Sequence, residues 1–276
     1  MKSTGDYGRE GDDGAGQLLH ALFEKDRLGY LGFFVQGLIH NINGPLQNMS
    51  MLVEIFEKSL ESQDLMVRQA CPELQEKWAL LHEKQEKRCA QLQQQITVLA
   101  EMMRDFMIVH ELERSGTEID LNLLLSKLGR VFRADLFFKH QVQFDLRLAR
   151  NLPLVRIPGR HFVPAVVHIF RNCLTAMRGA DRRELVVETR MDEDLIRASF
   201  EDTGCGFGSG EDAESLFDLF HSRWPIREAE LGRDEKHLGF GLYAARSLLA
   251  PYGVTLRLEP LPSGARCVIE IPVRGK

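Results

Sequence analysis

Apolar positions in the first half of the chain recur at helical spacing. From Leu31 to Phe56 they follow one another every three or four residues, with Pro45 at one of these positions, which predicts an amphipathic helix. A second stripe, close to heptad spacing, runs from Leu74 to Phe106 and predicts another long helix. Each stripe is narrow, so a single pair of such helices would leave apolar surface in water. We therefore expect an antiparallel hairpin that pairs with a second copy to form a homodimeric four-helix bundle.

The pattern changes after Glu113. The polar stretch "RSGTEID" has the composition of a domain boundary, and beyond it strand-like alternation mixes with helical periodicity. Helices are predicted at residues 121–132, 160–177 and 240–249, and strands at residues 142–148, 184–190, 195–202, 254–260 and 265–272. This arrangement predicts the α+β class, with one sheet covered by helices on one face.

Composition limits the class of protein. The glycine-rich, acidic start predicts disorder over residues 1–16, the two helices fill residues 17–115, and a second domain fills residues 116–276. A net charge of -5 and a pI near 6.0 give no sign of a nucleic-acid partner. The five scattered cysteines, without CxxC spacing, indicate a reducing compartment and neither a zinc site nor a disulfide framework. No apolar run approaches the roughly 20 residues that span a bilayer, and the start is no signal peptide, so we expect a cytoplasmic protein without a membrane span.

Two segments of the second half combine polar groups with special backbone. In "HIFRNCLTAM", Asn172 interrupts an apolar helix, and a buried amide costs about 1–3 kcal/mol unless it has a partner, either a metal-bound phosphate or a hydrogen bond in the core. In "FEDTGCGFG", a strand ends at Asp202 and runs into Gly204 and Gly206. Those glycines let the backbone turn tightly against a ligand, and the carboxylate accepts hydrogen bonds from a donor such as an exocyclic amine.

A third segment, "HLGFGL", opens a helix with Gly239 and Gly241. Free N–H groups at a glycine-flanked helix start form an anion site suited to phosphates. Taken singly, each of the three segments is also common as a plain structural feature: an amide bonded to backbone, a strand-to-turn junction, or a capping turn. Their order along one domain makes the combination more specific than its parts.

In this order the segments resemble the ATP-binding domain of sensor histidine kinases, which belongs to the GHKL superfamily and has the Bergerat-type α/β sandwich fold. "NCLTAM" resembles the N box, "EDTGCGFG" the G1 box, "LFDLFHSRW" the F box and "HLGFGL" the G2 box. The resemblance implies that Asn172 holds Mg²⁺ on the phosphates of ATP and that Asp202 binds the adenine amine. It also implies that Gly204 and Gly206 pass close to the base.

The same resemblance implies that Gly239 and Gly241 wrap the phosphates, with residues 209–238 as a mobile lid. Three positions depart from the family pattern. His168 stands where the family often has asparagine, and His237 where it often has glycine. Arg223 replaces a lysine or threonine of the F box; it is either a substitute phosphate contact or a solvated lid residue.

The first predicted helix contains "HNINGPLQ", whose glycine and proline weaken a helix. At 100° per residue His40 points away from the apolar stripe, on the side of Gly44. The segment resembles the H box of histidine kinases, which implies that His40 is the phosphoacceptor. Asn41 replaces the family's acidic residue; its amide oxygen can orient the imidazole but cannot take a proton, so autophosphorylation is expected to be slow. Gly44 lacks the side chain that serves phosphatase activity in the family, which predicts weak phosphatase activity unless Gln47 takes that role.

These resemblances together predict a dimeric two-component histidine kinase. It would use Mg·ATP to phosphorylate His40 and pass the phosphoryl group to an aspartate of a response-regulator receiver domain. Its input would come from a separate sensor protein or from the segment around residues 18–31. The alternative is a degenerate kinase that acts as a dimeric binding module or regulates another kinase, with little or no catalysis. A GHKL ATPase of another branch, or a serine kinase of that superfamily, is a third reading, against which the histidine-bearing helices argue.

Overall fold

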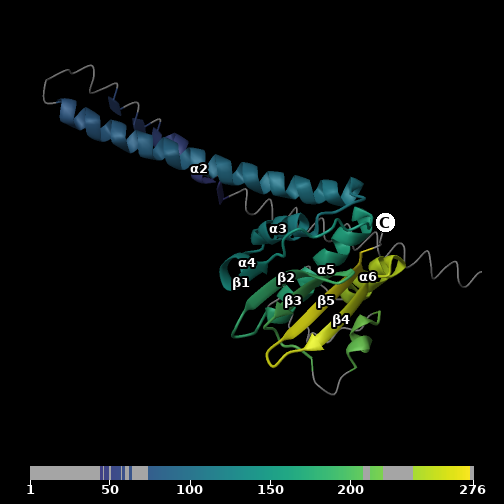
Figure 1. Cartoon of the computed structure of the whole chain (residues 1–276). Coiled ribbons are helices and arrows are strands. Elements are labelled where there is room, and N and C mark those ends of the chain that lie inside the picture. The colour runs from purple at the N-terminus through teal and green to yellow at the C-terminus, as the bar shows by residue number, and fades with distance from the viewer. Residues whose placement is uncertain are drawn as a thin grey trace, which may run out of the picture. The chain divides into compact units, whose positions relative to one another are not determined.

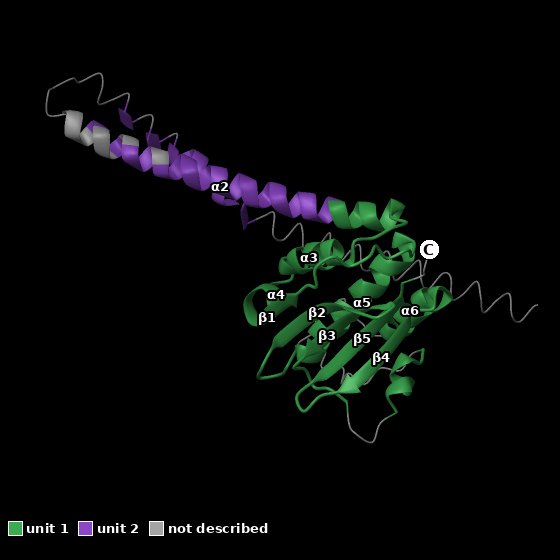
Figure 2. Cartoon of the chain, in the orientation of Figure 1, with its two compact units in different colours: residues 1–32, 108–276 green, residues 33–107 purple. Residues whose placement is uncertain are grey.

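The structure is a computed structural model that describes residues 44–45, 47–49, 51–56, 58–59, 62–63, 74–207, 212–219 and 239–273. It divides into two compact units (Figure 2). One comprises residues 33–107, and the other residues 1–32 and 108–276. We refer to the first as the helical unit and to the second as the sheet unit.

The helical unit consists of two neighbouring helical segments. The described residues between 44 and 63 are helical and lie alongside the long helix α2 (Leu74–Ser115), as Figure 1 shows. Gln85 donates a hydrogen bond from Nε2 to Ser59 Oγ at 3.2 Å, which joins the two segments. Leu52 and Ser59 are buried. The predicted pairing of two helices is therefore present within the chain, whereas His40 and Asn41 lie outside the described residues.

Helix α2 ends where its last carbonyl groups meet a glycine. Gly116 donates its N–H to the Leu112 carbonyl oxygen at 3.1 Å, and a Cβ at residue 116 would lie 2.4 Å from that oxygen. The last residues of α2, from Ile108 onward, belong to the sheet unit. The unit boundary therefore falls inside the helix, several residues before the polar stretch that follows Glu113 in the sequence.

The sheet unit has a five-stranded sheet in the order β1-β2-β3-β5-β4. Strands β1 and β2 are parallel, and the other neighbouring pairs are antiparallel. Its elements are α3 (Leu121–Val131), η1 (Phe132–Ala134), α4 (Leu136–Gln141), β1 (Gln143–Arg147), α5 (Gly159–Met177), β2 (Glu184–Asp192), β3 (Leu195–Asp202), η2 (Ala213–Phe217), α6 (Gly241–Leu249), η3 (Ala250–Tyr252), β4 (Thr255–Pro260) and β5 (Ala265–Pro272). The predicted α+β class and the eight predicted elements of this part are confirmed.

Helices cover one face of this sheet, and the alternation of residues along β3 shows why. Ile196, Ala198, Phe200 and Asp202 are buried, and the residues between them are partly exposed. Helix α5 packs on the buried face of β3 and against α6. Phe170 of α5 lies 5.5 Å from Phe200, measured between ring centroids. The helix that carries Asn172 is thereby fixed directly over the end of β3.

The opposite face of the sheet is lined by charged pairs. Glu270 on β5 binds Arg197 of β3 at 2.7 Å and also pairs with Arg257 of β4. Arg266 on β5 binds Glu201 of β3 at 2.7 Å. Cross-strand pairs of opposite charge suit a solvated face, which explains why helices occupy the other side only.

Short elements were absent from the sequence-based expectations. Helix α4 has six residues, and its N-cap Asp135 accepts a hydrogen bond from Phe138 N at 3.1 Å. So short a segment has too few turns for a periodic apolar pattern. Among the described residues, no helix combines the length and the apolar character needed to cross a membrane.

Candidate nucleotide site

One face of α5 brings the three predicted motifs together. His168, Asn172 and Ala176 are four residues apart, so they share a face of the helix. A Cβ on Gly241 would lie 3.5 Å from His168 Nδ1, and one on Gly204 would lie 2.5 Å from the carbonyl carbon of Ala176. Asn172, which is half-buried, therefore lies on this face between the contact to the start of α6 and the contact to the glycine loop after β3.

Asp202 is a buried carboxylate with capacity left to accept a further hydrogen bond. Asp202 is 4% exposed, and its Oδ1 accepts a hydrogen bond from Gly204 N at 2.9 Å. Burial raises the pKa of Asp202 to about 6, against the lowering effect of that hydrogen bond and of the neighbouring Cys173 and Ala265. A carboxylate has about four acceptor positions, so it can still receive one donor from outside, as an adenine amine would require.

The glycines after β3 are required by close packing. Gly204 approaches the backbone of Ala176 so closely that a side chain there would collide with it. Gly206 has φ +60, and a Cβ on it would lie 2.6 Å from the Gly264 carbonyl oxygen. Cys205 donates its N–H to the Ala176 carbonyl oxygen at 3.1 Å. The loop therefore lies between the end of α5 and the β4–β5 turn. A ligand that binds at the end of β3 could approach the backbone closely there, because these glycines have no side chains.

Gly264 is a residue that the sequence reasoning missed. Its φ is +93, and a Cβ there would lie 1.8 Å from the Asp202 carbonyl oxygen. The β4–β5 turn can therefore approach the end of β3 only because this residue is glycine. The available signal was a glycine directly before the last predicted strand, in "PSGARC".

The start of α6 presents backbone N–H groups that have no partner within the helix itself. Gly239 is left-handed with φ +65, and the N-cap Phe240 makes no side-chain capping hydrogen bond. The Phe240 ring lies edge-on to the His168 ring, with centroids 6.5 Å apart. Because the first N–H groups of a helix lack partners within the helix, this start suits an anion. His168, in a position where the family often has asparagine, is buried beside it.

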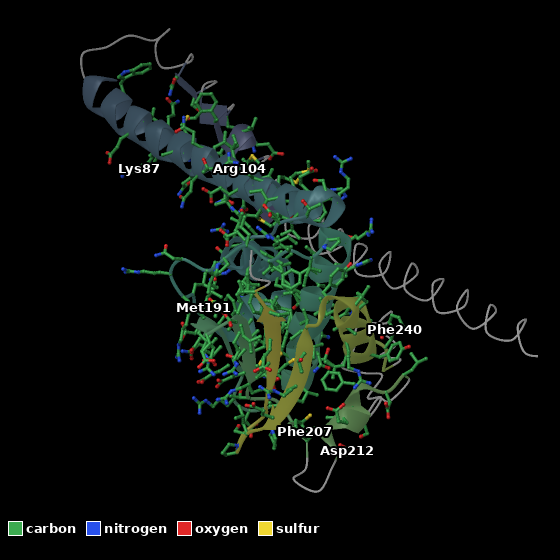
Figure 3. All side chains as sticks on the ribbon, turned by 45° about the vertical axis from the view of Figure 1, so that its right-hand side comes forward. Lys87, Arg104, Met191, Phe207, Asp212 and Phe240 are labelled. Carbon is green, nitrogen blue, oxygen red and sulfur yellow. The ribbon has the colours of Figure 1, made fainter. Side chains whose placement is uncertain are left out.

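The short helix η2 is attached to α6 through Arg246, another residue that the sequence reasoning missed. Its guanidinium lies 4.8 Å from the centroid of the Phe217 ring and donates to the Phe217 carbonyl oxygen at 3.2 Å. It also binds Glu214 at 3.1 Å. Figure 3 shows Phe207 and Asp212 at the lower end of the unit and Phe240 at its right-hand edge, beside α6.

Several predicted site residues lie outside the described part of the chain. They are His40, Asn41, Arg223 and His237, together with residues 209–211 and 220–238 of the predicted lid. Gly44 is described: it is helical and exposed, and a Cβ on it would meet nothing within 4 Å. Asn172, Asp202, Gly204, Gly206, Gly239 and Gly241 are all described, and the structure groups them around the end of β3, α5 and the start of α6.

A sensor protein is among the known proteins that are similar to this chain. No protein-family model matches the sequence. The chain is 26% identical over 249 residues to the sensor protein FixL of Bradyrhizobium diazoefficiens, which covers 90% of this chain and 44% of FixL. The chain is therefore similar to a sensor protein. The resemblance predicted from the motifs is confirmed, although the chain spans less than half the length of this curated relative.

Solved histidine kinase structures are also similar to it. The histidine kinase AdeS of Acinetobacter baumannii matches with a TM-score of 0.44 and 15% identity, over 81% of this chain and 96% of that one. The ATP-binding domain of PrrB from Mycobacterium tuberculosis matches with a TM-score of 0.40 and 19% identity, over 56% of this chain and 95% of that one.

Proposed function

We propose that the chain is the core of a two-component histidine kinase that binds Mg·ATP in its sheet unit and phosphorylates His40. One observation carries the proposal: the buried carboxylate of Asp202, the glycine loop after β3 and the start of α6 meet on the face of α5 that bears Asn172. The first two suit an adenine ring and the third suits phosphates. A Bergerat-type fold is the architecture that this grouping supports.

The residues present fit Mg·ATP. Asp202 would accept a hydrogen bond from the adenine amine. Gly239 and Gly241 would expose backbone N–H groups to the phosphates. The amide oxygen of Asn172 would be the protein ligand to Mg²⁺, an ion that prefers oxygen ligands and keeps several waters. When bound, Mg²⁺ would neutralise phosphate charge and orient the γ-phosphoryl group.

In the proposed reaction an imidazole nitrogen of His40 attacks the γ-phosphorus of ATP. A nitrogen–phosphorus bond forms, the bond to the bridging oxygen breaks, ADP leaves, and the imidazole proton passes to solvent. Asn41 would hold the ring by accepting its other N–H. The phosphoryl group would then move from His40 to an aspartate carboxylate of a receiver domain, which frees the imidazole again.

Exposed apolar side chains on the helical unit support a homodimer as the working form. On α2, Ile96, Met103 and Met107 are 49%, 39% and 59% exposed. Exposed apolar side chains on a helix pair favour association with a second copy of the chain, because association removes them from water. A separate sensor protein remains our proposal for the source of the input signal.

Labelling with γ-phosphate-labelled ATP tests the assignment of His40. We expect label that is acid-labile and alkali-stable on the wild type, and none on His40→Gln. The matched control is His110→Gln, because His110 is an exposed histidine on α2 outside the proposed chemistry. Equal labelling of the wild type and His40→Gln would reject His40 as the phosphoacceptor.

The alternative function is a degenerate kinase that serves as a dimeric binding module. Gly44, exposed and without a side chain beside the proposed phosphoacceptor, and His168, buried at the phosphate end of the site, favour it. This alternative predicts binding of adenine nucleotide without a phosphorylated histidine. Stoichiometric labelling of His40 followed by transfer to a receiver domain would eliminate it.

A further inference from the structure

Positive charge is concentrated in one stretch of the sheet unit. Residues 121–183 hold twelve lysines and arginines against three aspartates, so this stretch carries +9 although the whole chain carries -5. It includes α3, α4, β1 and α5. So uneven a distribution indicates a surface for an anionic partner, which the net charge of the chain does not reveal.

The outer face of α3 carries part of this charge. Leu123, Lys127 and Arg130 lie within about 60° of one another around the helix, at 100° per residue. Leu123 is 39% exposed, and Arg130 is exposed as well. The opposite side of the helix packs into the core through four buried leucines, Leu121, Leu124, Leu125 and Leu128.

Helix α4 repeats this arrangement directly after η1, which adds the exposed Arg133. Leu136 is 45% exposed and Lys139 is exposed, whereas Phe138 on the other side of the helix is buried. Asp135 is the one acidic residue in the sequence from 121 to 141. Its carboxylate caps α4, pairs with Arg178 at 3.5 Å and is largely buried, so it neutralises little of the outer charge.

The inner sides of α3, η1 and α4 cover one aromatic core. The Phe132 ring stacks on Phe170 of α5 with centroids 4.8 Å apart and lies 6.3 Å from the Phe138 ring. The Phe138 ring lies 5.2 Å from Phe144 of β1, at the β1 side of the sheet (Figure 1). The outer sides therefore form one surface, which we call the basic face: Leu123, Lys127, Arg130, Arg133, Leu136 and Lys139.

Two arginines at the end of α5 and before β2 extend the positive charge beside α4. The guanidinium groups of Arg178 and Arg183 each lie 5.5 Å from the centroid of the Phe137 ring. Arg183 also donates a hydrogen bond to the side chain of Gln141. These contacts attach the α5–β2 loop to α4 and hold both cations next to the basic face.

We propose that the basic face binds the surface of an anionic lipid membrane. Its lysines and arginines would lie at the level of the headgroups, and Leu123 and Leu136 would enter the boundary with the acyl chains. Cations that alternate with exposed apolar side chains are the pattern of an interfacial helix. The cations are spread over two helices and a turn, which suits a partner whose negative charge is also spread over a surface. Such binding requires no nucleotide, so it is tested separately from the proposed function.

Co-sedimentation of the full chain with vesicles of phosphatidylcholine and phosphatidylglycerol, at about 0.1 M salt, tests the role of charge. Each lysine or arginine near an anionic surface strengthens binding by roughly fivefold. The double variant Arg133→Glu, Lys139→Glu should thus bind more than about tenfold more weakly than the wild type. The matched control is Arg104→Glu, Arg190→Glu, which makes the same change of net charge at exposed positions on α2 and β2. It should stay within about threefold of the wild type, because these positions lie outside the basic face.

A tryptophan at position 136 tests whether the basic face enters the membrane. Leu136→Trp should gain fluorescence that brominated phospholipid quenches, over the signal of the wild-type chain. Met191→Trp is the matched control, because Met191 is 42% exposed but lies on β2, and its added fluorescence should not be quenched.

Four outcomes would overturn the proposal. They are a wild-type chain that does not sediment with the anionic vesicles, as expected if the basic face binds an acidic protein instead; equal sedimentation with phosphatidylcholine alone; equal losses in the two double variants; and a residue at position 136 that brominated lipid does not quench.

Discussion

At the scale of single residues, burial of the Asp202 carboxylate lowers the free energy of unfolding at neutral pH. Its pKa rises from 3.8 to about 6 because the side chain is buried. The folded chain therefore holds the proton more tightly than the unfolded chain does. Below pH 3.8 the carboxyl is protonated in both states, and Asp202 does not lower the free energy of unfolding. The loss of stability grows as the pH rises and reaches a plateau above pH 6. At about 1.4 kcal/mol per pKa unit, the plateau is on the order of 3 kcal/mol.

Replacing Asp202 by asparagine should therefore stabilise the protein while abolishing binding of adenine nucleotide. We expect the free energy of unfolding at pH 8 to rise by up to about 3 kcal/mol, and the gain to shrink toward pH 5 as the wild-type carboxylate becomes protonated. Urea unfolding at several pH values measures this difference. The control is Asp194→Asn, an exposed aspartate between β2 and β3. A gain that stays constant from pH 5 to 8 would contradict the assignment of the raised pKa.

The residue after the proposed phosphoacceptor carries a second prediction. The amide of Asn41 can accept a hydrogen bond from the imidazole but cannot remove its proton. A general base typically raises a rate by about 10²–10⁴. Asn41→Glu should thus speed autophosphorylation of His40, measured as initial labelling rate at saturating ATP. Asn41→Gln, an amide of the same length as glutamate, is the control and should give no gain. An unchanged rate in Asn41→Glu with normal nucleotide binding would count against a missing base as the limiting feature.

The sequence predicted residues whose role depends on local context and missed those whose role depends on contacts across the fold. Asp202 and Gly204 stand together in one recognisable turn, so their spacing alone indicated a site. Gly264 acquires its role only because the β4–β5 turn meets the end of β3. The residues that neighbour Gly264 in the sequence do not indicate this contact between distant segments.

At the scale of elements, length decided what could be predicted. The 19-residue α5 and the 8-residue β3 each repeat their apolar pattern often enough to be recognised. The 5-residue η2 does not, and its position depends on contacts with α6, 32 residues away between Glu214 and Arg246. Its N-cap Asp212 accepts a hydrogen bond from Glu214 N at 3.0 Å, but such a capping turn is not specific in a sequence.

Arg246→Met should release η2 from α6. The exposed ion pair with Glu214 contributes little, so the main losses are the cation–π contact with Phe217, about 0.5–1 kcal/mol, and the hydrogen bond to its carbonyl oxygen. We expect faster amide hydrogen exchange over residues 213–217, measured by mass spectrometry, and weaker nucleotide binding. Arg257→Met is the control, because Arg257 pairs with Glu270 on the face of the sheet that helices do not cover. Unchanged exchange in Arg246→Met would show that other contacts hold η2.

At the scale of the whole molecule, the narrow apolar stripes predicted an assembly rather than a lone hairpin. Leu52 and Ser59 are buried within one chain, so the two helical segments satisfy part of that stripe between themselves. Ile96 and Met103 remain exposed although both belong to the stripe on α2. Seven residues turn a straight helix through about 700°, which leaves these two side chains within about 20° of one face.

This face supports the final prediction, that α2 forms the seam between two copies. The double variant Ile96→Lys, Met103→Lys should be monomeric at micromolar concentration, because two lysines would place unpaired charge in an apolar seam. Sedimentation equilibrium measures the mass. Gln94→Lys is the control: Gln94 is exposed and lies about 200° around the helix from Ile96, so it should leave the dimer intact. The monomeric variant should still bind nucleotide, because Asp202 and the start of α6 belong to the other unit. A double variant that remains dimeric would mean that the copies meet through a different surface.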